Sequence, residues 1–120
     1  PEAKKTLLDK ATTSKILRTV PHHEGFHFFK ELGQPTDKVA TSLTDFNKTI
    51  QTIDIQSINF HFKRQDFEKW IKNILNDTEL SGKINKIKKD THGEKLRNQI
   101  IQTIKERLKE LQTTQTKTQT

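Results

Sequence analysis

The stretch GEKLRNQIIQTIKERLKEL, residues 93–111, places an apolar side chain at every third or fourth position. Charged and amide side chains fill the positions between them, so one face of a long helix is apolar and the others are polar. The apolar face holds Leu96, Ile100, Ile104, Leu108 and Leu111, with Ile101 beside them. Because such a helix depends on packing partners for its stability, the stretch predicts a helical bundle.

A second helical pattern lies upstream in TDKVATSLTDFNKTIQTID, residues 36–54, for which Thr36 is the predicted N-cap. Its apolar residues, three or four apart, are Val39, Leu43, Phe46, Ile50 and Ile53. Between these two long helices, Asp66 and Asp77 are predicted to cap two shorter ones, the first running to Leu75 and the second to Ile87.

Two more short helices are predicted, in SKILRTV before Pro21 and in GFHFFKEL before Gly33. The strand-like alternation of INFHF is too short to form a stable sheet. We therefore predict an all-α fold, a compact bundle of five or six helices with a disordered polar C-terminal tail.

The composition allows one small domain with one modest core, because the chain has 120 residues and is 29% hydrophobic. We assign residues 1–112 to the helical bundle domain and residues 113–120, which lack apolar side chains, to a disordered tail or linker. Residues 1–12 are predicted to form a loosely docked helix. No apolar run approaches the roughly 20 residues that span a bilayer, and no leader pattern opens the chain. We expect a cytoplasmic monomer that makes no membrane contact.

The net charge of +7 is concentrated in the second half of the sequence. Residues 1–60 carry eight Lys and Arg against seven Asp and Glu, whereas residues 61–112 carry thirteen against eight. A basic excess of this kind favours phosphate-rich partners, because phosphate neutralisation releases counterions. A lysine-rich surface that only keeps the domain soluble is the simpler interpretation.

The sequence offers little catalytic chemistry. There is no cysteine and no G-x-S-x-G motif, and Gly82-Lys83 lacks the rest of a phosphate-binding loop. Asp66 and Glu68 have the D-x-E spacing of a two-metal site, but on a helix their side chains diverge. His22, His23 and His27 lie close together, and the spacing of His23 and His27 could place two imidazoles on one helix face, but no third ligand follows at a zinc-type spacing. We predict neither a catalytic residue nor a metal site, and the domain is not expected to be an enzyme by itself.

The stretch SINFHFKRQDFEKW, residues 57–70, gathers three phenylalanines and the single tryptophan among cations. If Ser57 caps a short helix, part of this cluster must point away from the core. Phe60, His61, Lys63 and Arg64 are then exposed, where an aromatic face could stack on a base and the cations could meet phosphates. In the alternative interpretation all the rings fill the core, and Lys63 and Arg64 lie at the C-terminal end of a helix, where the helix dipole favours positive charge. The spacing of Trp70 from Phe67 and Ile74 favours the core for the tryptophan.

Lysines extend this surface along the next helices. Lys86 and Lys89 lie on the polar face of the helix after Asp77, and Lys83 flanks them. Lys69, Lys72 and Arg97 could widen the ridge into a groove. The predicted nucleic-acid and nucleotide site comprises Phe60, His61, Lys63, Arg64, Lys69, Trp70, Lys72, Lys83, Lys86, Lys89 and Arg97.

The run from GFHFFKELGQPTDKVATSL through SINFHFKRQDFEKW to GEKLRNQIIQTIKERLKEL resembles the helix bundle domain that follows the catalytic module of archaeal plasmid replication primase-polymerases. It is also similar to an uncharacterised archaeal helical domain with the same order of landmarks. The resemblance covers residues 22–111 and includes no signature motif. It implies an accessory domain that binds single-stranded DNA template and ATP or another nucleoside triphosphate, with or without magnesium, beside a separate catalytic module. The polymerase carboxylates are absent from this chain.

A second hypothesis comes from a different functional class. The domain could be a protein-interaction or regulatory bundle fused to an unrelated enzyme, with a basic surface that docks an acidic partner and no nucleic-acid role. Because salt weakens both kinds of contact, only titration with nucleic acid and free nucleotide separates the two hypotheses.

Overall fold

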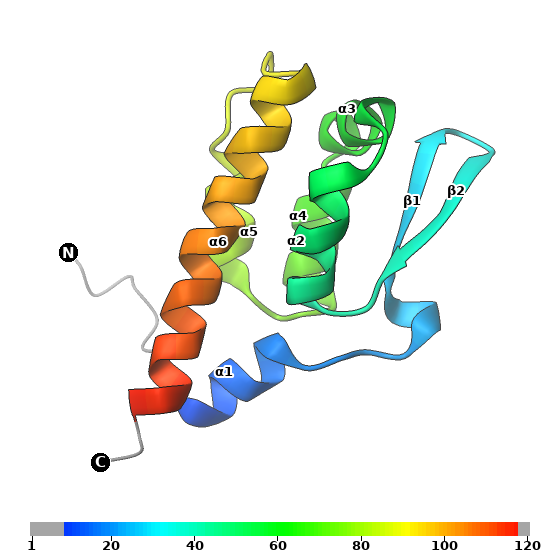
Figure 1. Ribbon diagram of the computed structural model, residues 1–120. Coiled ribbons are helices and arrows are strands. Elements are labelled where there is room, and N and C mark those ends of the chain that lie inside the picture. The colour runs from blue at the N-terminus through cyan, green and yellow to red at the C-terminus, as the bar shows by residue number, and fades with distance from the viewer. Residues whose placement is uncertain (1–8, 118–120) are drawn as a thin grey trace.

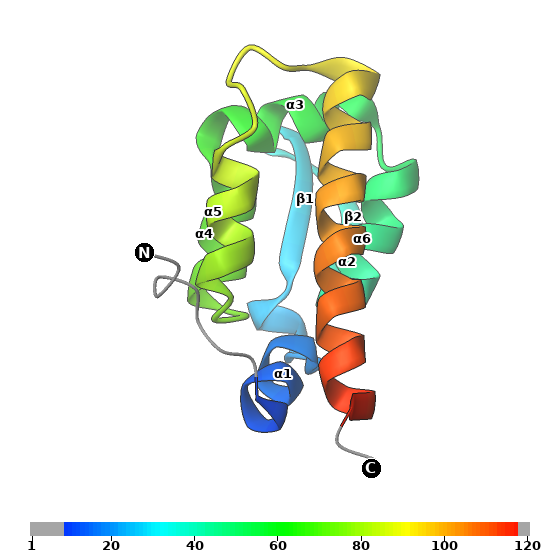
Figure 2. The same cartoon turned by 90° about the vertical axis from the view of Figure 1, so that its left-hand side faces the viewer.

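The computed structural model describes residues 9–117, with side chains described to residue 115, and shows a mostly helical domain that also contains a β-hairpin (Figure 1). The elements in chain order are α1 (Lys10–Leu17), a 3-10 turn (His22–Glu24), β1 (Phe26–Glu31), β2 (Gln34–Ala40), α2 (Leu43–Thr52), α3 (Ile55–Arg64), α4 (Asp66–Asn73), α5 (Thr78–Asn85) and α6 (Gly93–Lys117). The hairpin packs on α3 and α2, and α6 packs on α1, α2, α3 and α5. The hairpin and α6 lie on opposite sides of the molecule (Figure 2).

The hairpin corrects the all-α prediction. GFHFFKEL is not helical, because Phe26 and Phe28 alternate with His27 and point into the core as one face of β1. β1 pairs antiparallel with β2, with Phe26 opposite Ala40 and Glu31 opposite Gln34. Gly33, with φ of 78°, makes the tight turn between the strands. At the start of β1, a side chain on Gly25 would lie 2.7 Å from the carbonyl oxygen of Ala40, so only glycine lets the strands meet there.

The helix predicted over residues 36–54 is therefore shorter and starts later. Thr36 does not cap it, because its hydroxyl donates to the carbonyl of Phe28 across the hairpin at 2.8 Å. α2 begins after Ser42, whose Oγ accepts the N–H of Asp45 at 3.1 Å, and Asp45 in turn accepts the N–H of Thr41. These two hydrogen bonds differ from a capping box only in that Asp45 returns to the residue before the N-cap, and they end the strand and start the helix within three residues.

Other predicted helix starts differ in detail. Ser57 is buried inside α3, and Asp54 is the residue that caps this helix, accepting the N–H of Gln56 at 2.8 Å. Asp66 is the first residue of α4, and Gln65, in the left-handed conformation, precedes it. The prediction for Asp77 is confirmed, since its carboxylate accepts the N–H of Leu80 at 3.1 Å at the start of α5.

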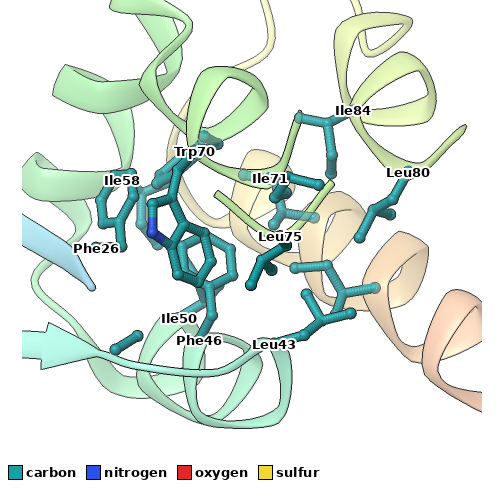
Figure 3. Packing of buried hydrophobic residues seen from close by; sticks show 14 of the residues in the cluster. Phe26, Leu43, Phe46, Ile50, Ile58, Trp70, Ile71, Leu75, Leu80 and Ile84 are labelled. Atoms are coloured by element: carbon teal, nitrogen blue, oxygen red, sulfur yellow. The ribbon is translucent and has the colours of Figure 1, made fainter. Parts of the chain in front are cut away.

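The core is a single cluster between the hairpin and α6. Figure 3 shows Trp70 beside Phe46 and Phe26, with Ile71, Leu75 and Leu80 continuing the cluster. Trp70 is 7% exposed and its Nε1 donates to the carbonyl of Glu24 at 2.9 Å. The prediction that Trp70 belongs to the core is confirmed, and the tryptophan offers no free face for stacking.

The last helix extends beyond the predicted bundle boundary at residue 112. α6 continues to Lys117, because threonine, glutamine and lysine do not break a helix and the Thr114 hydroxyl donates to the carbonyl of Glu110 at 3.1 Å. Residues 118–120 of the predicted tail, and residues 1–8 of the predicted N-terminal helix, lie outside the described residues. None of the helices in the described part of the chain is both long and apolar enough to cross a membrane.

Candidate nucleic-acid interface

The hairpin and α3 enclose a small hollow with aromatic walls, which we name the aromatic pocket. Its volume is about 260 Å³. It is lined by Phe26, His27, Phe29, Leu32, Gly33, Phe60, His61, Arg64 and Asp66. Three residues of the predicted site, Phe60, His61 and Arg64, therefore come together here. The Arg64 guanidinium carbon lies 5.2 Å from the centre of the Phe60 ring, within cation–π range.

The four predicted site residues on α3 differ in how exposed their side chains are. Lys63 and Arg64 are exposed, as predicted, and Phe60 is half-buried. His61 was also expected to be exposed, and this is wrong, because its side chain is 5% exposed. His61 Nε2 accepts the backbone N–H of Phe29 at 2.9 Å, so Nδ1 carries the proton and donates to Asp66 Oδ2 at 2.8 Å. The histidine thus ties β1 to the start of α4 and forms the base of the pocket.

Asp66 receives a second donor, because Arg64 Nε lies 3.0 Å from the same carboxylate oxygen. Burial lowers the pKa of His61 below its ordinary value, against the opposing effect of the Asp66 hydrogen bond and charge, and the Arg64 charge lowers it further. His61 is therefore the neutral tautomer that the Phe29 hydrogen bond requires.

This lowered pKa predicts a loss of stability in mild acid. Since His61 binds a proton more weakly in the folded domain than in the unfolded chain, the free energy of unfolding should decrease as the pH falls below about 6.5, until the pH passes the folded pKa. The lowered pKa values of Asp9 and Asp54 act only near and below their ordinary value of 3.8. Urea unfolding at about pH 7.5 and pH 5 therefore measures the effect of His61 above the pH range in which the two aspartates act.

The matched variants are His61→Gln and His23→Gln, the second removing an exposed histidine. We expect the decrease between the two pH values to nearly vanish in His61→Gln and to persist in His23→Gln. An equal decrease in all three proteins would assign the pH dependence to other groups.

A second hollow lies between α4 and α5, and we name it the α4–α5 cleft. Its volume is about 470 Å³. It is lined by Gln65, Glu68, Lys69, Lys72, Asn73, Thr78, Ser81, Gly82 and Asn85. Lys69 and Lys72 are exposed, so two of the predicted basic residues stand beside an open, polar cleft.

The remaining predicted lysines do not form one ridge. Lys86 lines a third hollow of about 610 Å³ near the start of α6, together with Lys88, His92 and Lys95. Lys83 lies 3.6 Å from Glu79. Lys89 donates to the backbone and side-chain oxygens of Asn85 at 3.0 and 3.2 Å.

Arg97 does not extend the groove. Its side chain is 12% exposed, and Nη1 donates to the carbonyl of Ile50 at 2.7 Å while Nε donates to Glu94 at 2.8 Å. Arg97 therefore fastens the start of α6 to the end of α2, and its role is structural.

Consecutive residues at the corner between α3 and α4 line the aromatic pocket and the α4–α5 cleft. Arg64 and Asp66 line the pocket, whereas Gln65, between them, lines the cleft. Gln65 has φ of 62°, and its N–H closes α3 on the carbonyl of Phe62 at 3.0 Å. A single left-handed residue therefore joins an aromatic surface to a basic one.

Sequence reasoning missed several lining residues. Phe29 and His27 reach the pocket because they belong to a strand, and the alternation in FHFF was the signal for it. Leu32, 75% exposed, lies at the hairpin turn and also lines the pocket. His27 packs edge to face against His22 at 5.3 Å. No group of three potential metal ligands gathers within residues 9–117.

The fold and these surfaces define a small, basic, mostly helical domain with an aromatic pocket beside a lysine-rimmed cleft. Residues 2–87 match a family model described as "Family of unknown function (DUF5752)", and the chain belongs to this family. The matched range ends at the close of α5 and includes both the pocket and the cleft. No curated protein and no solved structure matches the chain.

Proposed function

We propose that this domain binds single-stranded nucleic acid, with one unstacked base in the aromatic pocket and the neighbouring phosphates along the α4–α5 cleft. The observation that carries the proposal is that three consecutive residues, Arg64, Gln65 and Asp66, line an aromatic pocket and a basic cleft. In a single strand, each flat base is followed by an anionic phosphate. Proteins bind such strands with aromatic side chains that stack on the bases and a basic groove that follows the phosphates.

The pocket suits a base in size and chemistry. A hollow of about 260 Å³ is small for a drug-sized ligand and accommodates one flat ring system. Phe60 and Phe29 provide apolar walls, and the Arg64 guanidinium provides a second flat surface on which a ring can stack. The Asp66 carboxylate, 22% exposed, is a hydrogen-bond acceptor for a base N–H.

The proposal extends to nucleoside triphosphates, as the resemblance to primase bundle domains implies. The hollow lined by Lys86, Lys88, His92 and Lys95 is the proposed place for the triphosphate, because its three lysines can neutralise the triphosphate charge there. Asp90 lines the same hollow and is available for an accompanying magnesium ion. A role in primer initiation, beside a separate catalytic module, stays a prediction that rests on the resemblance.

The test is a binding titration of a fluorescent oligo-dT of about ten nucleotides at about 50 and 200 mM salt. We expect affinity to fall roughly tenfold or more between the two salt concentrations if several phosphates are bound. Phe60→Ala should weaken binding by about tenfold at low salt, which is the usual contribution of one stacked base. The matched control is Ile101→Ala, which shortens a half-buried apolar side chain on α6 that lines none of the three hollows.

The exposure of Leu32 beside an apolar pocket favours the alternative of a protein-docking domain, because an apolar side chain of a partner could fill the pocket. Absence of saturable binding to oligo-dT and to ATP with magnesium at low salt would reject the nucleic-acid proposal and leave this alternative. Backbone amide shifts in the same titrations report whether residues 60–72 respond.

A further inference from the structure

The α4–α5 cleft contains a buried carboxylate that lacks hydrogen bonds. The Glu68 side chain is 8% exposed, and neither of its carboxylate oxygens accepts a hydrogen bond from any residue in the described part of the chain. The nearest cation, Lys89 Nζ, is 3.7 Å from Oε2, which is beyond hydrogen-bond distance. Since a buried charged group without donors is costly, a ligand that supplies them gains more there than at the surface.

The neighbours of Glu68 form a polar network that can open. Gln65 Nε2 donates to Asn85 Oδ1 at 3.2 Å, and Lys89 Nζ donates to the same oxygen. Lys89 is the residue that approaches the carboxylate, and its side chain is 53% exposed. A long, half-exposed lysine can swing away from Glu68 without disturbing the core, and its charge is then available to a phosphate.

The charges around the cleft select the class of ligand. Lys69 and Lys72 stand at the cleft and Lys89 beside it, so a cationic donor is repelled and an anionic molecule is attracted. The ligand must therefore carry N–H donors on one part and negative charge on another. A nucleotide has both, with donors on the base and charge on the phosphate.

Because both carboxylate oxygens of Glu68 lack hydrogen-bond donors, the base that fits best is one with two adjacent donors. Guanine presents two adjacent donors, N1–H and the N2 amino group, on its Watson–Crick edge, and these match the two oxygens of one carboxylate. Adenine and cytosine present one amino group next to an unprotonated ring nitrogen, whose lone pair would face the second oxygen. Thymine presents one N–H between two carbonyl oxygens.

We infer that the α4–α5 cleft holds a guanine base, in a single strand or as a free nucleotide, with N1–H and N2–H donating to Glu68 and the phosphate beside Lys69 and Lys72. The inference rests on the proposed function and deepens it. The aromatic pocket then supplies stacking without base preference, and Glu68 supplies the preference.

The experiment compares oligo-dT strands of about ten nucleotides whose central base is thymine, guanine, adenine, cytosine or hypoxanthine. For the wild-type domain we expect the guanine strand to bind about tenfold tighter than the thymine, adenine and cytosine strands, a typical value for a two-hydrogen-bond base contact. Hypoxanthine keeps N1–H and lacks the N2 amino group, so its strand should lie between guanine and thymine. These comparisons need no variant protein.

Glu68→Gln keeps the shape of the side chain and replaces one acceptor oxygen by a donor. It should abolish the guanine preference, measured as the ratio of the affinities for the guanine and thymine strands. The matched control is Glu106→Gln, which removes the same charge from an exposed position on α6 and should retain the preference. Competition with free GMP, and with AMP as its control, tests whether a free nucleotide binds as well as a strand. GMP displaces the guanine strand only if a free nucleotide is also a ligand.

Equal binding of all five strands by the wild-type domain would overturn the inference while leaving the proposed function in place. A guanine preference that survives in Glu68→Gln would also overturn it, because another group would then read the base. Absence of binding to every strand at low salt would reject both the inference and the proposed function.

Discussion

Replacing Lys69 and Lys72 together by glutamate is expected to weaken binding to oligo-dT by about 30-fold at low salt. The two lysines are the exposed cations of the α4–α5 cleft, so the change removes two phosphate contacts and adds repulsion at the same place. The dependence of affinity on salt concentration should become shallower, because fewer counterions are released on binding. The measurement is the fluorescence titration at about 50 and 200 mM salt.

The matched control for this variant is Lys48→Glu with Lys109→Glu. These lysines are exposed on α2 and α6 and line none of the three hollows described above, but their replacement changes the net charge by the same amount. We expect the control to lose only a few-fold in affinity, through the weaker overall field. If both double variants lose the same affinity, binding follows net charge alone and the cleft has no special role.

Asp77→Ala is expected to lower the free energy of unfolding by about 3–5 kcal/mol, because it leaves Arg107 buried without its main partner. Asp77 is 1% exposed and Arg107 is 2% exposed. The two carboxylate oxygens accept Arg107 Nε and Nη2 at 2.8 and 2.9 Å. Burial acts against the charge on Arg107, but hydrogen bonds to Asp77 and Glu110 outweigh it and raise its pKa above the ordinary value. The guanidinium therefore stays charged in the core and needs these partners.

Asp77 also caps α5, and the two contributions can be separated by urea unfolding of three variants. Ser42→Ala removes only a cap, that of α2, and should cost about 1 kcal/mol. Asp77→Asn keeps an acceptor for the Leu80 N–H and removes the charge, so its cost should lie between those of Ser42→Ala and Asp77→Ala. A cost for Asp77→Ala no larger than that for Ser42→Ala would show that the buried ion pair contributes nothing.

The helices from α3 to α6 were largely predictable, because their apolar residues recur with helical spacing and face one core. The hairpin was missed for a physical reason that Val39 illustrates. Its spacing from Leu43 and Phe46 fits a helix, but the N-cap at Ser42 starts the helix only after it. A pattern of apolar residues says which residues are buried and does not by itself distinguish the end of a strand from the start of a helix.

The candidate site was predictable only in part. Phe60 and Arg64 were chosen for residue type and do share a pocket, but its other wall is a strand more than thirty residues earlier in the chain. His61 and Arg97 resemble surface cations in sequence, and their burial depends on single backbone partners, Phe29 and Ile50, which periodicity does not reveal. Glu68 had a possible metal role only through its spacing from Asp66, and the lack of hydrogen-bond donors to its oxygens is seen only in the folded structure.

The left-handed corner at Gln65 also fixes how the two surfaces are oriented toward each other. Because Gln65 alone joins α3 to α4, few backbone torsions separate the residues that line the pocket from those of α4 that line the cleft. In the proposed complex the strand would therefore bear most of the conformational entropy cost of association, because it must bend to reach from the pocket to the cleft. Affinity should then depend on how readily the strand bends at that step, so the flexibility of the ligand becomes a determinant of recognition.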